Sequence, residues 1–69
     1  MKAVNSSAIS HIGYDKDSRV LTIVFTHGGA YTFADVPEEV HESFLNADSI
    51  GQHFHQHIRP NFEGTRSKQ

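Results

Sequence analysis

The sequence has no cysteine, so neither a disulfide bond nor a thiolate metal site stabilises the fold. It also lacks a long apolar run, because the longest covers only residues 20–25 and is interrupted by Thr22. A membrane span needs about 18–20 apolar residues. Residues 1–7 contain one lysine and no apolar core, unlike a signal peptide. These absences predict a cytoplasmic protein that does not bind membranes.

An excess of positive charge is missing too. Six Lys and Arg against eight Asp and Glu give a formal charge of −2, which is not typical of a strong nucleic-acid binder. The six histidines complicate this reading, since protonating all of them would change −2 to +4. Unperturbed imidazoles have a pKa of about 6.5, so the net charge is expected to change sign as the pH falls through about 6–7.

A chain of 69 residues forms a single domain, and it shows no repeat and no linker. We place this domain at residues 3–62. Residues 63–69 contain no apolar side chain, which predicts a flexible C-terminal tail.

Three strands are predicted. Residues 4–14 alternate imperfectly and indicate an edge strand, residues 19–26 are mostly β-branched or aromatic, and residues 30–34 follow a glycine turn. A three-residue loop would pair Phe25 with Tyr31 and collect the large apolar side chains on one face. Gly29 would then take the left-handed position of the turn.

Two short helices should follow. Pro37 and the acidic residues beside it favour a helix over about residues 37–46, and a capping-box pattern at Ser49 favours another that ends by Arg59, before Pro60. The predicted fold is α+β, a three-stranded antiparallel β-meander followed by two short helices on one face (β-β-β-α-α). The expected core consists of Ile9, Ile12, Leu21, Ile23, Phe25, Tyr31, Phe33, Val36, Val40, Phe44, Leu45, Ile50, Phe54 and Ile58.

The ordered combination of several short motifs resembles the KTSC domain family, which occurs at the C-terminus of some lysyl-tRNA synthetases and as short bacterial and phage proteins. The resemblance covers about residues 3–62 and rests on Ser6-Ser7, Ile9, Ile12-Gly13-Tyr14-Asp15, Leu21, Ile23, Phe25, Gly28-Gly29, Tyr31, Phe33, Val36-Pro37, Ala47, Ser49, Gly51, Phe54 and Ile58-Arg59.

The chain departs from this family at two places. The family's Tyr-x-Tyr reads Tyr31-Thr32-Phe33 here, so the second hydroxyl is lost while packing or stacking is kept. His53 and His55 stand where the family often has an aromatic residue and an asparagine. The synthetase context of the family implies RNA binding, by analogy alone.

A histidine cluster is the densest group of chemically active side chains. His53 and His57 are four residues apart on one helix face and are weak candidates for a metal site, while His55 points elsewhere. No third metal ligand is evident in the sequence, and two solvent-exposed histidines without a metal ion are the simpler interpretation. The sequence predicts no cofactor.

Other candidates also have plainer roles. Tyr31 and Phe33 suit base stacking, but the periodicity favours the core. Arg59 is suited to bind a phosphate, but it is also suited to stabilise the C-terminal end of its helix by interacting with the helix dipole. The nucleic-acid-binding residues we nominate are Tyr14, Arg19, His53, His55, His57 and Arg59.

The sequence therefore predicts a non-enzymatic domain, since no nucleophile–base pair or cofactor motif can be assembled. RNA is the first expected partner, with an affinity that rises at lower pH and falls with salt. The alternative is a protein-interaction or self-association module that uses the uncovered sheet face with Val20, Thr22 and Val24. Histidine-mediated metal binding is a distant third.

Overall fold

The structure is a computed structural model that describes residues 2–4 and 6–67. Along this part of the chain the elements are β1 (Lys2–Ala3), β2 (Ile9–Asp15), β3 (Val20–Phe25), β4 (Ala30–Phe33), α1 (Glu38–Leu45), α2 (Ile50–His53), the π-helix η1 (Phe54–Ile58) and β5 (Gly64–Ser67). No helix in these ranges is long and apolar enough to cross a membrane.

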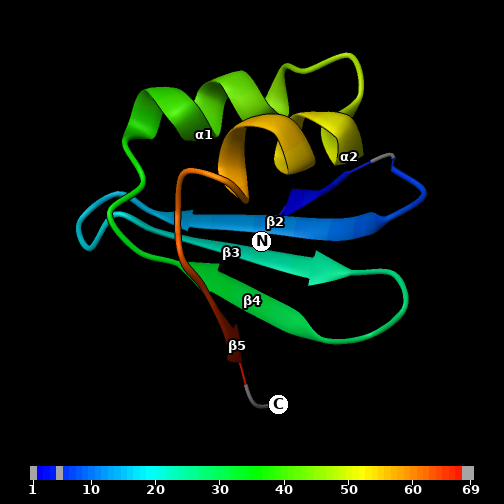
Figure 1. Ribbon diagram of the computed structural model, residues 1–69, viewed down its shortest axis with the longest axis horizontal. Coiled ribbons are helices and arrows are strands. Elements are labelled where there is room, and N and C mark those ends of the chain that lie inside the picture. Colours follow the sequence, from blue (N-terminus) through cyan, green and yellow to red (C-terminus); the bar gives the residue numbers. More distant parts are fainter. Residues whose placement is uncertain (1, 5, 68–69) are drawn as a thin grey trace.

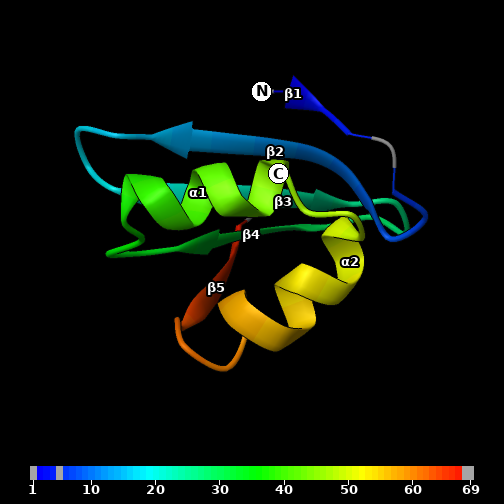
Figure 2. The ribbon, with the colours of Figure 1, turned by 90° about the horizontal axis from the view of Figure 1, so that it is seen from above.

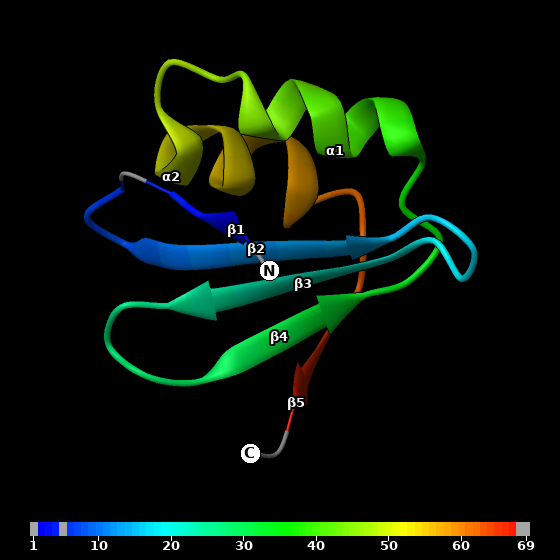
Figure 3. The same ribbon diagram turned by 180° about the vertical axis from the view of Figure 1, so that it is seen from behind.

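The strands form one antiparallel sheet in the order β1-β2-β3-β4-β5. Both α1 and the continuous α2–η1 helix lie on the same side of this sheet (Figure 1). Seen from above, α1 lies in front of the central strands and the end of η1 approaches β5 (Figure 2). The opposite sheet face carries no helix of the described chain (Figure 3). The predicted α+β class is confirmed, with five strands in place of the expected three.

The strand expected over residues 4–14 begins only at Ile9, and a separate short strand, β1, precedes the predicted range. β1 pairs antiparallel with β2, so the chain reverses between Ala3 and Ile9. The Ser6 hydroxyl supports this reversal by accepting hydrogen bonds from the N–H groups of Ala8 and Ile9, at 3.3 and 3.4 Å. Serine hydroxyls compete with strand pairing in this way, which is why the strand does not extend back to residue 4.

A β-bulge explains why the alternation in β2 is imperfect. The register of β2 against β3 shifts between Ile9 and His11, which leaves Ser10 as an extra residue. Ile9 and Ile12 therefore both face the helices, although they are three residues apart. Their exposed fractions are 0% and 1%.

The β3–β4 hairpin keeps the predicted facing but not the predicted register. Ile23 pairs with Tyr31, whereas the prediction placed Phe25 there. The turn starts one residue earlier than expected, since the N–H of Gly28 donates to the carbonyl of Phe25 at 3.1 Å. Gly28 and Gly29 both have positive φ, 101° and 92°, so two glycines take the left-handed conformation instead of Gly29 alone. A shift of two residues leaves every side chain on its predicted face.

The flexible tail expected over residues 63–69 is wrong for residues 64–67, which form β5 along the open edge of β4. The side chains of β5 are small or polar, so no burial pattern marks the strand in the sequence. β5 is favoured because its backbone forms hydrogen bonds with the edge of β4, which would otherwise be unpaired. Residues 68–69 lie outside the described part of the chain.

The helices begin and end close to the predicted residues. Glu38–Leu45 matches the expected 37–46 to within one residue at each end. The Ser49 hydroxyl caps α2 by accepting a hydrogen bond from the N–H of Gln52 at 3.4 Å. The helix then widens into the π-turns of η1 and ends before Pro60. The π-helical geometry was not predicted.

The core lies between the sheet and the helices. Its buried members are Ile9, Ile12, Leu21, Ile23, Phe33, Val36, Phe44, Phe54 and Ile58, all of which were predicted. Five further predicted residues are only partly buried: Phe25, Tyr31, Val40, Leu45 and Ile50. Val4, Ala8, Tyr14 and Phe62 also pack against the core, although the prediction omitted them.

Candidate functional site

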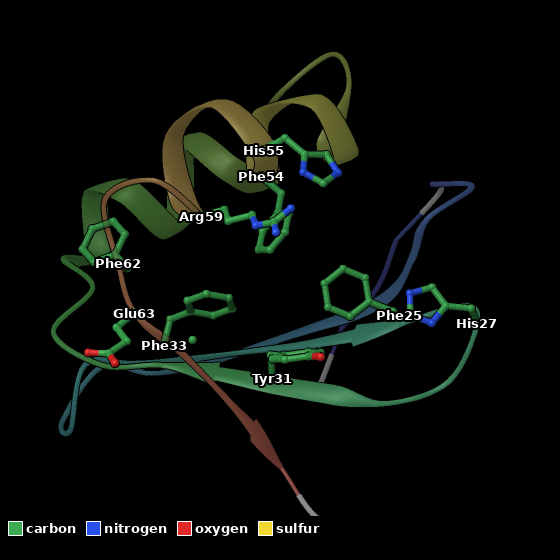
Figure 4. Close-up of a pocket in the computed structure, with 10 residues that line it drawn as sticks. Phe25, His27, Tyr31, Phe33, Phe54, His55, Arg59, Phe62 and Glu63 are labelled. Atoms are coloured by element: carbon green, nitrogen blue, oxygen red, sulfur yellow. The ribbon is translucent and has the colours of Figure 1, made fainter.

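An open cleft of about 520 Å³ lies between the sheet and η1. One wall comes from β3, β4 and their turn, and the other from η1 and the loop that follows it (Figure 4). We call this the aromatic cleft, and it is lined by Phe25, His27, Tyr31, Phe33, Phe54, His55, Arg59, Phe62, Glu63 and Gly64.

A network of aromatic rings forms the floor of the aromatic cleft. The Phe54 ring centroid lies 5.5 Å from that of Phe25 and 5.6 Å from that of Phe33, in edge-to-face geometry. Phe25 meets Tyr31 in the same geometry at 5.6 Å. Such pairs favour particular ring orientations. Phe33 and Phe54 are buried, whereas Phe25 and Tyr31 are half-buried and leave ring surface open to the cleft.

Three nitrogen-bearing side chains surround these rings. The His27 ring stacks on Phe25 with centroids 5.5 Å apart, and the His55 ring lies 5.4 Å from Phe54. The Arg59 side chain extends from the end of η1 towards the ring cluster (Figure 4). All three are exposed. The aromatic cleft therefore combines flat apolar surface with hydrogen-bond donors that suit an anion.

The geometry of η1 determines which side chains face the cleft. The N–H of Arg59 donates to the carbonyl of Phe54, five residues earlier, at 2.9 Å. This wide turn keeps Phe54 and Ile58 in the core while His55 and Arg59 line the aromatic cleft. Single π-turns within helices occur frequently at functional sites.

One acidic residue, Glu63, also lines the aromatic cleft. Its carboxylate points away from the ring cluster in Figure 4. The face of the cleft that presents the rings therefore carries the guanidinium of Arg59 as its permanent charge.

A second groove, of about 530 Å³, separates α1 from another side of the α2–η1 helix. The rings of His53 and His57 lie in it with centroids 4.5 Å apart, and the Phe44 ring stacks beside His53 at 5.7 Å. Burial, and secondly the charge of His57, lower the pKa of His53 below its ordinary value of 6.5. We call this the histidine groove, lined by Glu39, Val40, Ser43, His53, His57, Asn61 and Phe62.

A metal centre is not assembled in the histidine groove. Across residues 2–4 and 6–67, no group of three or more His, Cys, Asp or Glu side chains is arranged to hold a metal ion. His53 and His57 are thus a pair without a third ligand from the described chain.

Tyr14 and Arg19 lie away from the aromatic cleft. The Tyr14 ring stacks on His41 at 4.5 Å, and its hydroxyl donates a hydrogen bond to the carbonyl of Val36, which ties β2 to the segment entering α1. Arg19 is exposed in the β2–β3 turn with a positive φ of 60°. This turn is at the opposite end of β3 from His27.

The structure thus divides the six nominated residues among three places. His55 and Arg59 lie in the aromatic cleft, and His53 and His57 lie in the histidine groove. Tyr14 and Arg19 belong to neither.

His27 was not predicted as a site residue, and Phe25 and Tyr31 were predicted as core residues. The available signal was a histidine directly before a Gly-Gly turn, with an aromatic residue on each flanking strand. Large rings that a short helix leaves half-covered at the end of a hairpin are candidates for a binding surface.

Comparisons with known proteins support one family. Residues 5–62 match the KTSC domain. An uncharacterized protein of Stutzerimonas stutzeri is 40% identical over 58 residues, which cover 84% of this chain and 82% of that protein. The crystal structure of a KTSC domain protein from Yersinia pestis has a TM-score of 0.93 at 39% identity, and the match covers 97% of this chain and 94% of the other.

A much longer relative shares the same region. A lysine–tRNA ligase of Nostoc punctiforme is 39% identical over 57 residues, which cover 83% of this chain. They cover only 10% of the ligase. The similarity therefore concerns a small part of that protein.

Proposed function

The chain belongs to the KTSC domain family, and from this premise we propose that it is a non-enzymatic, cytoplasmic binding module for single-stranded RNA. The bases would stack in the aromatic cleft. The name of the ligase relative agrees with an RNA context, although the chain matches only a tenth of that protein.

One observation carries the proposal: the partly open rings of Phe25 and Tyr31 lie in the same cleft as the Arg59 guanidinium. Unpaired bases stack on aromatic side chains, and each stacked base contributes about 1–3 kcal/mol. A guanidinium is always charged and donates hydrogen bonds to phosphate in a planar, paired geometry. A nucleotide offers both matching groups on one molecule.

The charge of the chain limits the expected strength of binding. A formal charge of −2 gives no general attraction to a polyanion. Binding would depend on a few local contacts, and each cation–phosphate contact makes the affinity more sensitive to salt. We therefore expect weak binding that weakens further as salt is added.

The lining of the aromatic cleft supports binding over catalysis. It contains no serine, threonine or cysteine that a neighbouring base could activate. Its imidazoles are engaged with aromatic rings, His27 with Phe25 and His55 with Phe54.

The proposal is tested by fluorescence anisotropy with labelled hexauridylate at pH 6.5 and low salt. We expect saturable binding that weakens about fivefold or more in Tyr31→Leu, because a stacking ring is lost. Arg59→Gln should weaken it as well. Arg19→Asn is the matched control, since it removes an exposed arginine that does not line the cleft, at a position where asparagine tolerates positive φ. Absence of saturable binding, or equal affinity in all variants, would overturn the proposal.

A second candidate function rests on the sheet face opposite the helices. Val20, Thr22 and Val24 are half-buried there, and no described helix covers them (Figure 3). This face is suited to a second copy of the chain. Sedimentation over a wide concentration range tests it: a concentration-dependent dimer supports self-association, and a monomer throughout excludes it.

A further inference from the structure

Strand β5 extends the ring-bearing face of the sheet beyond β4. Tyr31 of β4 pairs directly with Arg66 of β5. Residues paired in this way point to the same face of an antiparallel sheet. Arg66 therefore lies on the same face as Tyr31, whose ring lines the aromatic cleft.

The guanidinium of Arg66 reaches along the β3–β4 hairpin. A Cβ built on Gly29 would lie 3.8 Å from Arg66 Nη2 and 4.0 Å from its Nε. The group thus approaches the turn that carries His27. Gly29 has no side chain to cover it, and Arg66 is exposed.

Two arginines near Tyr31 lack side-chain partners among the described residues. Neither Arg59 nor Arg66 makes a side-chain hydrogen bond or ion pair with any residue of the described ranges. Tyr31 therefore has one available guanidinium across the cleft and another on the adjacent strand. Guanidinium groups without carboxylate partners are suited to phosphate, because charge-assisted hydrogen bonds to it are strong.

We propose that the RNA site extends from the aromatic cleft onto β5 and binds at least two consecutive nucleotides. One base stacks on Tyr31, one flanking phosphate contacts Arg59 and the next contacts Arg66. This inference rests on the proposed function and adds the minimum length of the ligand. It also adds a binding residue outside the segment 5–62 that matches the family.

The test compares two probes, labelled hexauridylate and uridine monophosphate, because a mononucleotide carries one phosphate whereas the proposed site contacts two. Arg66→Ala should weaken hexauridylate binding about three- to tenfold and reduce the slope of log affinity against log salt by about 0.7. Its affinity for uridine monophosphate, measured by NMR titration, should stay at the wild-type value. Arg66→Lys keeps the charge and should retain most of the affinity, and Arg19→Asn is again the matched control.

Three results would overturn the extension. Unchanged hexauridylate affinity and salt slope in Arg66→Ala would exclude Arg66 while leaving the proposed function intact. Equal losses for both probes would mean that β5 only shapes the cleft. Absence of hexauridylate binding by the wild-type chain would remove the proposed function together with its extension, and this outcome is distinguishable from the other two.

Discussion

The ring of His53 contacts two other rings, and these surroundings affect its protonation. The Phe44 ring, with an exposed fraction of 0%, is 5.7 Å away, and the His57 ring is 4.5 Å away. Burial is the larger cause of its lowered pKa, and the charge of His57 is the second. Glu39 of α1 also lines the groove and is the one acidic group there.

We predict that the His53 ring titrates below pH 6.5 when its proton signals are followed by NMR. His57→Gln should raise the pKa of His53 only part of the way to 6.5, because the contribution of burial remains. A titration midpoint at or above 6.5 in the wild-type protein would contradict the described geometry.

The lowered pKa of His53 also makes the stability of the fold depend on pH. The unfolded chain binds the His53 proton more readily than the folded chain does. The free energy of unfolding contributed by this group therefore falls as the pH decreases through about 6.5 towards the lower folded-state pKa. His53→Asn should accordingly flatten the loss of stability between about pH 7 and pH 5.5 in urea titrations.

At the scale of elements, the attachment of β5 depends on a glycine. Gly64 pairs with Phe33 across the strands. A Cβ at Gly64 would lie 2.6 Å from the ring of Phe33, which is 3% exposed and confined by its neighbours. The absence of a side chain at Gly64 is therefore what allows β5 to lie against β4.

We predict that Gly64→Ala lowers the free energy of unfolding by about 1–3 kcal/mol, as overpacking of a filled site does. Urea unfolding measures this directly. Thr65→Ala is the matched control, because its side chain points to the other sheet face and should change stability by less than about 1 kcal/mol. Wild-type stability in Gly64→Ala would show that β5 does not pack on Phe33.

Elements were predictable where side-chain burial determines them. The facing of β3 and β4 followed from their apolar alternation, and the start of α2 followed from the cap at Ser49. Features that depend on hydrogen bonds to the backbone were not predicted. The reversal at Ser6 and the pairing of β5 leave no mark on the apolar pattern, and the bulge at Ser10 shows in the sequence only as an imperfect alternation.

At the scale of the whole molecule, one helix separates two different surfaces. Its cleft side presents His55 and Arg59 to the sheet, and its other side presents His53 and His57 to α1. Helical spacing in the sequence already separated His53 and His57 from His55. It did not show that Arg59 shares a cleft with His55, because that depends on how the helix lies between the sheet and α1.

Only part of the aromatic cleft could be predicted from the sequence. Arg59 and His55 were identified by their charged or titratable side chains, but Phe25 and Tyr31 match the pattern of a core as well as that of a stacking surface. Which rings stay open depends on how far the short helices cover the sheet. Arg66 was assigned to the predicted flexible tail, because its strand lacks apolar residues.

The central claim is that the aromatic cleft binds single-stranded RNA, and an amide-resolved NMR titration of the labelled chain with hexauridylate tests it most directly. At pH 6.5 and low salt we predict saturable shifts confined to the aromatic cleft and β5, including Phe25, Tyr31 and Arg59, all of which weaken when salt is added. Amides of the β2–β3 turn and of the outer sheet face should stay unchanged. Shifts centred on the histidine groove, or no shifts at all, would contradict the account.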